Sequence, residues 1–66
     1  MTLTLNGEIM TLADGLNLAG LVASLDLDPR KVAIERNLEI VPRSAYATTL
    51  LSERDQIEIV HFIGGG

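Results

Sequence analysis

Polar and apolar side chains alternate at the start of the chain, which is the period of a β-strand. An Asn-Gly pair at positions 6–7 interrupts this alternation and favours a two-residue hairpin turn, because both residue types tolerate positive φ. A turn at this point pairs Leu3 with Met10 and Leu5 with Glu8. The hairpin then presents one face rich in leucine, and we expect that face to pack against the core.

The hydrophobic pattern changes its period after position 17. Asn17 is the predicted N-cap of a helix, since its side chain can accept a hydrogen bond from the first turn. We expect the segment to end at Asp28–Pro29, because the residue before a proline avoids helical geometry. A helix of about nine residues needs support from tertiary packing. Its apolar residues follow the spacing i, i+3, i+4 and i+7: Leu18, Leu21, Val22 and Leu25.

Strand character returns in the second half of the chain. Residues 32–41 are predicted to form two strands that turn near Asn37–Leu38. The following stretch, residues 43–51, is ambiguous. Within it, Ser44 is a candidate cap for a single helical turn, and Tyr46 is interpreted as a half-buried packing residue.

A β-branched strand, "QIEIVHF", closes the pattern, with Ile57 and Ile59 predicted to face the core. This last strand can lie beside the first and parallel to it, in the middle of a mixed sheet of four to five strands. The expected fold is therefore α+β: a ubiquitin-like β-grasp, in which the sheet packs on one helix. We expect the β-grasp domain to span residues 1–63 and a flexible glycine tail to span residues 64–66.

Composition narrows the possible functions. The 66 residues suffice for one small domain, which we expect to be a monomer when free. The chain has no cysteine to act as a nucleophile or metal ligand, and His61, its one histidine, cannot form a metal cluster alone. Nine acidic residues outnumber five basic ones, which argues against nucleic acid binding. The apolar runs are too short to cross a membrane and no targeting segment is visible, so we expect a cytoplasmic protein.

The alternation in the last strand sends Glu58, Val60 and Phe62 to the outer face of the sheet. Isolated exposed apolar residues are common, but Phe62 is one of two aromatic residues in the chain and lies close to the terminal glycines. We interpret these three residues as a small surface for docking to a partner. A further hypothesis is that the acidic residues Glu53, Asp55 and Glu58 steer docking toward basic partner surfaces.

The sequence ends in Gly64, Gly65 and Gly66, the narrowest thread that a polypeptide can form. Such a tail can be a disordered terminus, or it can carry the terminal carboxylate into an enzyme's slot. A carboxylate is ionised at neutral pH and must be activated before it reacts, most simply as a mixed anhydride with AMP. The sequence has no "GxxxxGK" loop, so activation needs a partner enzyme that uses ATP. We therefore expect a carrier and substrate protein with no bound cofactor, rather than an enzyme.

Two segments, "RNLEIVPRSAY" and "DQIEIVHFIGGG", resemble the sulfur carriers of thiamine thiazole biosynthesis, the ThiS family. The likeness covers essentially the whole chain, and its specific parts are the "IVPRS" stretch with its following aromatic residue and the terminal glycines. Arg36 and Leu38 depart from the family pattern, which usually has an apolar residue at the first position and a turn glycine or polar residue at the second. Both lie away from the tail, so they bear on local packing.

The resemblance implies a chemical role for the tail. Gly66 would be adenylated by an ATP-dependent activating enzyme of the kind that activates ubiquitin, and Gly64 and Gly65 would be recognised with it. The acyl-adenylate would then become a thiocarboxylate with sulfur from a cysteine desulfurase or a related donor. The thiocarboxylate would donate its sulfur to thiazole synthase.

Three alternatives stay open at this point. The small subunit of molybdopterin synthase is another β-grasp sulfur carrier with terminal glycines, although it is usually longer and tends to have prolines before them. A ubiquitin-like protein modifier would use the same acyl-adenylate to form isopeptide bonds. A β-grasp interaction module would have an inert tail. His61 and Arg43 are interpreted as a strand-end residue and a solvated charge.

Overall fold

The computed structural model describes residues 1–62. The predicted tail, and with it the predicted domain boundary after residue 63, lies outside the described residues. The elements follow the predicted order along the chain. They are β1 (Thr2–Leu5), β2 (Glu8–Thr11), α1 (Leu18–Ser24), the 3-10 turn η1 (Pro29–Lys31), β3 (Val32–Arg36), β4 (Glu39–Val41), the 3-10 turn η2 (Arg43–Ala45) and β5 (Gln56–His61).

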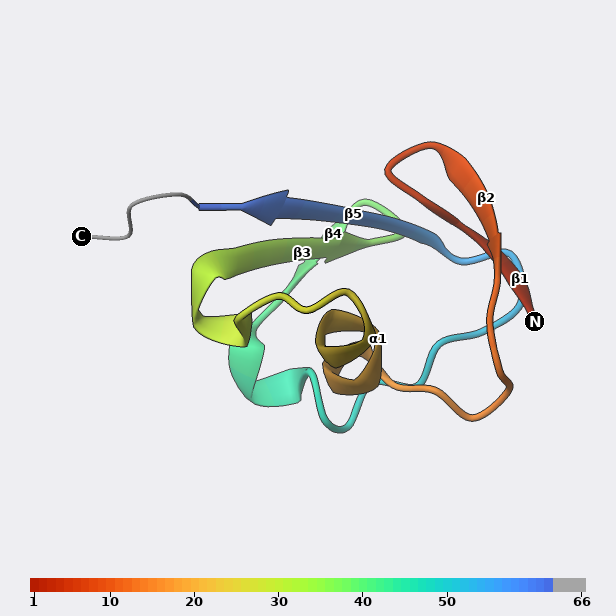
Figure 1. Cartoon of the computed structure of the whole chain (residues 1–66). Helices are drawn as coiled ribbons and strands as arrows, with labels where there is room; N and C mark the ends of the chain where they lie inside the picture. Colours follow the sequence, from red (N-terminus) through yellow and green to blue (C-terminus); the bar gives the residue numbers. More distant parts are fainter. Residues whose placement is uncertain (63–66) are drawn as a thin grey trace.

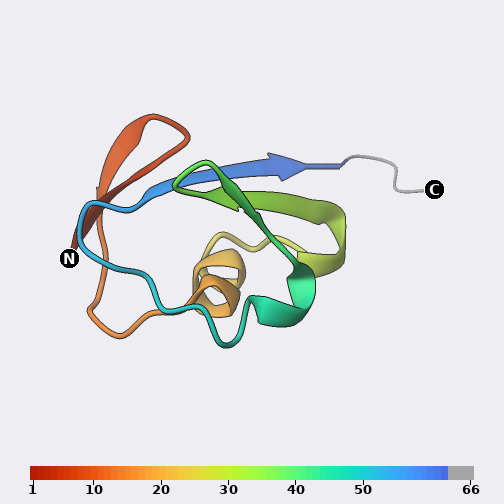
Figure 2. The ribbon, with the colours of Figure 1, turned by 180° about the vertical axis from the view of Figure 1, so that it is seen from behind.

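The five strands form one mixed sheet in the order β2-β1-β5-β3-β4. The last strand, β5, lies in the middle, parallel to β1 and antiparallel to β3. Figures 1 and 2, which view the molecule from opposite sides, show α1 lying against one face of this sheet. The arrangement is the predicted ubiquitin-like β-grasp, and it leaves the other face of the sheet without a helical layer within residues 1–62.

Both hairpins turn where the sequence predicts. The first has Leu3 opposite Met10 and Leu5 opposite Glu8, so the predicted register is confirmed. Its turn places Asn6 at a φ of 51°, in the left-handed region that asparagine tolerates better than most residues. The second hairpin turns at Asn37 and Leu38, and both residues have positive φ.

The helix begins as predicted but ends early. The Asn17 side-chain oxygen accepts a hydrogen bond from the backbone N–H of Gly20 at 2.7 Å, which confirms the N-cap. The predicted end at Asp28–Pro29 is wrong, because α1 stops at Ser24. The chain leaves the helix through Asp26, whose φ is 59°, while the N–H of Leu27 returns to the carbonyl of Val22. Glycine usually occupies this left-handed position after a helix. Position 26 is an aspartate, so the sequence did not mark the stop.

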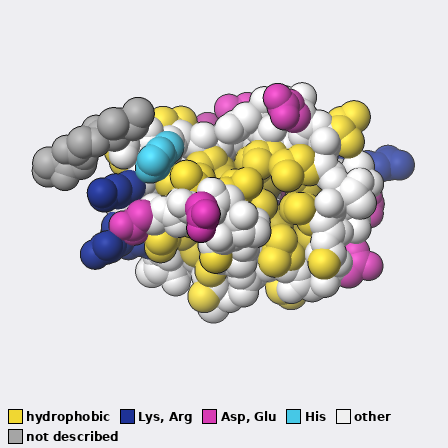
Figure 3. All heavy atoms as spheres, in the orientation of Figure 1, with side chains coloured by type: hydrophobic (Ala, Val, Ile, Leu, Met, Phe, Trp, Pro, Cys, Tyr) yellow, Lys and Arg dark blue, Asp and Glu magenta, His cyan; other side chains and the backbone are white. Residues whose placement is uncertain are grey.

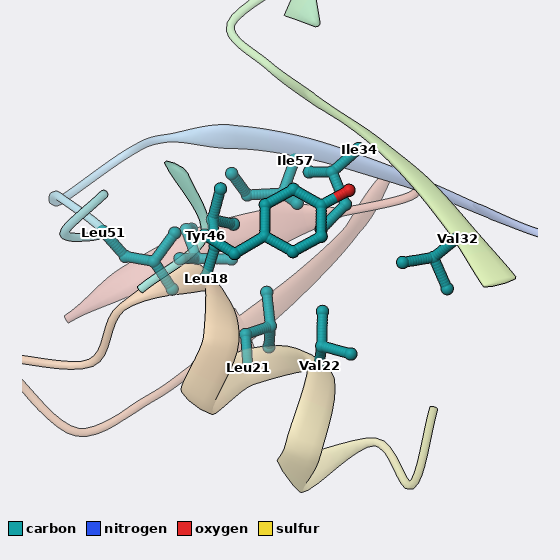
Figure 4. Close-up of a cluster of buried hydrophobic side chains, with 9 residues drawn as sticks. Leu18, Leu21, Val22, Val32, Ile34, Tyr46, Leu51 and Ile57 are labelled. Atoms are coloured by element: carbon teal, nitrogen blue, oxygen red, sulfur yellow. The ribbon is translucent and has the colours of Figure 1, made fainter. Parts of the chain in front are cut away.

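The core lies between α1 and the inner face of the sheet (Figure 4). Tyr46 is 4% exposed, so the prediction that it is half-buried is wrong, and burial raises the pKa of its hydroxyl group. Ser44 lies inside η2 and is not its cap. Within residues 1–62, the buried apolar side chains are Leu3, Leu18, Leu21, Val22, Val32, Ile34, Tyr46, Leu51 and Ile57. No helix in this part of the chain is long and apolar enough to cross a membrane.

Candidate functional site

The central strand β5 brings the predicted docking residues to the outer face of the sheet. Ile57 points into the core, whereas Glu58 and Val60 are exposed, as the period of a strand requires. Phe62 follows the strand and is also exposed, at 49% of its surface. The three predicted docking residues are therefore all exposed, and in the sequence they lie shortly before the glycines. Gly64, Gly65 and Gly66 themselves lie outside the described residues.

Neighbouring strands add apolar surface beside these residues. In the register of β3 and β5, Ala33 lies opposite Val60, and Glu35 lies opposite Glu58. Across the next pair of strands, Ile40 lies opposite Glu35 and is 79% exposed. We call the exposed apolar residues on this face of β3, β4 and β5, together with Phe62, the outer-sheet patch: Ala33, Ile40, Val60 and Phe62. Ile40 was not among the predicted docking residues, although the turn at Asn37–Leu38 fixes its position opposite Glu35.

A buried carboxylate holds the start of β5. Asp55 is 5% exposed and accepts hydrogen bonds from Arg36 Nε at 2.8 Å, from Asn37 Nδ2 at 3.0 Å and from the backbone N–H of Ser52 at 2.8 Å. Burial raises the pKa of this carboxyl, but the hydrogen bonds from Asn37, Arg36 and Ser52 outweigh it, so the pKa is lower than usual. Arg36, one of the two departures noted in the sequence, therefore has a structural partner in Asp55.

This network corrects the hypothesis of acidic steering. Asp55 is buried and bonded, so it presents no free charge to an approaching partner. Glu53 is exposed, but its carboxylate accepts the backbone N–H of Thr2 at 2.7 Å and so helps to fix the turn before β5. Of the three residues in the hypothesis, only Glu58 lies on the face that carries the outer-sheet patch.

Two asparagine side chains extend the pairing of β5 beyond its strand neighbours. The backbone N–H of Ile59 donates to Asn6 Oδ1 at 2.8 Å, and Asn6 Nδ2 donates to the Ile59 carbonyl at 3.3 Å. On the other side, Asn37 Oδ1 accepts the N–H of Gln56 at 2.9 Å, and the Asn37 N–H donates to the Gln56 carbonyl. Both asparagines are turn residues with positive φ, so each hairpin turn also anchors the central strand.

Comparison with known proteins identifies the family. Residues 3–66 match the model of the ThiS family. The chain belongs to the ThiS family. The ThiS family match extends through the terminal glycines and confirms the resemblance inferred from the two sequence segments.

Relatives of the ThiS family support the assignment over the whole chain. The sulfur carrier protein ThiS of Bacillus subtilis is 43% identical over 65 residues, covering 97% of this chain and 98% of that protein. The crystal structure of the thiamine biosynthesis protein ThiS of Geobacter metallireducens has a TM-score of 0.85 and 35% identity, with full coverage of both chains. A thiazole synthase of Paramagnetospirillum magneticum is 48% identical over all 66 residues. This chain spans 20% of the length of that synthase.

A groove lies on the opposite side of this ThiS-family chain from the outer-sheet patch, where α1 packs on the sheet. An apolar groove of about 270 Å³ lies between α1 and η2, and its lining residues are Ala19, Val22, Ala23, Leu27, Pro29, Arg43, Tyr46 and Ala47.

His61 is exposed at the end of β5, and Figure 3 shows the histidine beside basic side chains at that end of the molecule. Within residues 1–62, no three His, Cys, Asp or Glu side chains are grouped so that they could hold a metal ion.

Proposed function

We propose that this chain carries sulfur as a thiocarboxylate on Gly66 and delivers it to a thiazole synthase during thiamine biosynthesis. The observation that carries the proposal is the ThiS family match, which runs through the last glycine. The full-length identity with the sulfur carrier of Bacillus subtilis supports it. The match to the thiazole synthase of Paramagnetospirillum magneticum supports that enzyme as the acceptor, because this relative contains a counterpart of the whole chain.

The chemistry begins with activation of the carboxylate. A carboxylate oxygen of Gly66 attacks the α-phosphorus of ATP on a partner enzyme, and pyrophosphate leaves, giving the acyl-adenylate. The terminal sulfur of a persulfide, supplied by a cysteine desulfurase or a related donor, then attacks the carbonyl carbon and AMP leaves. A thiol reduces the resulting acyl disulfide, which releases the thiocarboxylate and leaves the thiol oxidised to a disulfide.

The folded domain contributes recognition to these steps. Glu58, Val60 and Phe62 would contact the activating enzyme, because they lie on the outer face of the strand that runs toward Gly66. An interface needs an apolar centre with a polar rim, and Glu35 with Glu58 would form part of that rim. Gly64 and Gly65 would pass through a slot too narrow for side chains.

The experiment that tests this function is a reconstitution followed by intact mass spectrometry. The purified chain is incubated with ATP, the activating enzyme of the same organism, a cysteine desulfurase, cysteine and a thiol. We expect a product in which one oxygen of the chain is replaced by sulfur. A chain that lacks Gly66 is the matched control and should remain unmodified.

The product also separates the alternatives. A covalent adduct with a lysine of another protein would indicate a protein modifier instead of a sulfur carrier. A thiocarboxylate that supports molybdopterin formation but not thiazole formation would assign the chain to the other sulfur pathway. An unmodified chain under all conditions would overturn the proposal.

A further inference from the structure

The central strand continues past the end of one of its neighbours. On the β1 side, β5 pairs at two positions, Thr4 with Gln56 and Leu5 with Ile57. Beyond them the Asn6 side chain takes the backbone groups of Ile59. On the β3 side, by contrast, pairing continues as far as Val32 opposite His61. The last residues of β5 are therefore held by a strand on one side only.

The ladder with β3 fixes the direction of the His61 backbone. The N–H of Phe62 donates to the carbonyl of Lys31 at 2.7 Å, so Phe62 and Lys31 form a hydrogen-bonded pair. Hydrogen-bonded and non-hydrogen-bonded pairs alternate along antiparallel strands. Val32 and His61 therefore form a non-hydrogen-bonded pair, and the N–H and C=O of His61 point away from β3. Ile59 has the same parity, and its N–H does point away from β3, toward Asn6.

The backbone of His61 thus faces the β1 side at a level that β1 does not reach. The first hairpin has already turned at Asn6–Gly7, and within residues 1–62 no other strand is adjacent to β5 on that side. Natural sheets commonly protect such an edge with lysine, proline or an inward-pointing charge. Val60, His61 and Phe62 include none of these. An unprotected edge of this kind is a template for a strand from another chain.

We propose that an extended segment of the activating enzyme adds to this edge as a further strand and hydrogen-bonds to the backbone N–H and C=O of His61. This inference rests on the proposed function. Strand addition gives affinity through main-chain hydrogen bonds and specificity through alternating side chains. Here Val60 and Phe62 would contact the added segment from the outer face of the sheet, and the His61 side chain from the inner face.

The position of the edge favours the enzyme that handles Gly66 over a second copy of this chain. His61 lies five positions before Gly66 in the sequence, so a strand held there would align the chain with the site of adenylation. Two copies paired along so short an edge would bury far less than the roughly 1,200 Å² of a stable interface. The open edge is also continuous with the outer-sheet patch through Val60 and Phe62.

The test replaces a single backbone N–H by oxygen. A chain of 66 residues is accessible to chemical synthesis, so the amide that contains the His61 nitrogen can be made as an ester. An ester that replaces the N–H of Ala13, which lies in an exposed loop, is the matched control. We expect the His61 ester to weaken binding to the purified activating enzyme about fivefold, the value of one ordinary hydrogen bond. The Ala13 ester should bind as the unmodified chain does.

A second measurement reads the same amide directly. In the free chain the N–H of His61 should exchange rapidly with solvent, whereas that of Phe62, which is bonded to Lys31, should be protected. Binding of the enzyme without ATP should slow the exchange of His61 at least tenfold. Unchanged exchange, equal effects of the two esters, or slowed exchange on self-association without the enzyme would overturn the inference.

The outcomes distinguish this inference from the proposed function. If the unmodified chain is adenylated and the His61 ester binds equally well, the strand addition is wrong and the carrier function stands. If the unmodified chain neither binds the enzyme nor is adenylated, both are overturned.

Discussion

Asn6 and Ile59, which are 53 residues apart in sequence, are joined by two hydrogen bonds between the asparagine amide and the strand backbone. The asparagine thus takes the place of a further residue of β1 in the ladder. A residue of the turn of the first hairpin therefore also anchors the central strand at Ile59, the fourth of its six residues.

Replacing this asparagine should separate its two roles. Asn6→Gly keeps the freedom to adopt positive φ but removes both hydrogen bonds to Ile59, so we expect the free energy of unfolding to fall by about 1–2 kcal/mol. Urea denaturation gives this value directly. Asn6→Asp retains the acceptor for the Ile59 N–H and should lose less. A glycine variant as stable as the parent would show that the side chain does not anchor β5.

Asp55 should make the largest polar contribution to stability at neutral pH. Asp55→Ala leaves Asn37 Nδ2 and the Ser52 N–H without their acceptor and Arg36 without its counter-charge. We expect a loss of about 2–4 kcal/mol, at the lower end of values for buried ion pairs because Arg36 keeps partial access to water. Glu39→Gln, an exposed carboxylate on β4, should change the free energy of unfolding by less than about 0.5 kcal/mol.

The same carboxylate should make stability depend on pH. The pKa of Asp55 is lower in the folded chain than the value near 3.9 expected when it is unfolded. As the pH falls, the unfolded chain therefore binds this proton first. The contribution of ionised Asp55 should be complete above about pH 5 and should be lost as the pH falls through the folded pKa. Urea denaturation between pH 2 and 7 should show this loss in the parent chain and a smaller one in Asp55→Asn.

Asn17 should stabilise both the helix and the loop beside it. Its side chain accepts from Gly20 N–H at 2.7 Å and donates to the Ala47 carbonyl at 3.1 Å. Asn17→Ala should lower the free energy of unfolding by about 1–2 kcal/mol, because it removes the cap and this second bond. Asn17→Asp keeps the cap alone, so its stability should lie between the other two. Equal stability of all three chains in thermal denaturation would contradict this assignment.

The outer-sheet patch should affect binding and leave folding intact. Phe62→Ala removes an aromatic side chain that is half exposed in the free chain, so we expect little change in stability. Affinity for the activating enzyme should fall by tenfold or more, as is typical of an aromatic residue at the centre of an interface. Calorimetric titration measures this affinity. Leu50→Ala, another exposed apolar residue outside this face, is the control and should bind normally.

Local turn chemistry and strand period determined most of what could be predicted. The Asn-Gly pair at 6–7 fixed the register of the first hairpin, and the alternation around Ile57 separated core from surface on the last strand. The parallel placement of β5 beside β1 followed from the order of elements along a short chain. These features depend on residues close together in sequence or on a topology with few alternatives.

The errors at Asp55 and Tyr46 arose where distant segments meet, whereas the error at the helix end is local. Asp55 lies in a polar turn, and nothing in its neighbours indicates that Arg36 and Asn37 will enclose it. Asp26 ends the helix in a left-handed conformation for which asparagine or glycine is the usual marker. Tyr46 is buried in the core between α1 and the sheet, which the ambiguous stretch around it could not show. The predicted tail residues lie outside the described part of the chain.

The place of β5 has a mechanical consequence for handling by partner enzymes. Backbone hydrogen bonds run across the strands, so a pull along β5 from its C-terminal end loads the bonds to β1 and β3 together. If the last strand were at the edge of the sheet, a force perpendicular to it could break its backbone hydrogen bonds one after another. Tension transmitted through the terminus is thus resisted in shear, which is the sturdiest orientation that a sheet offers.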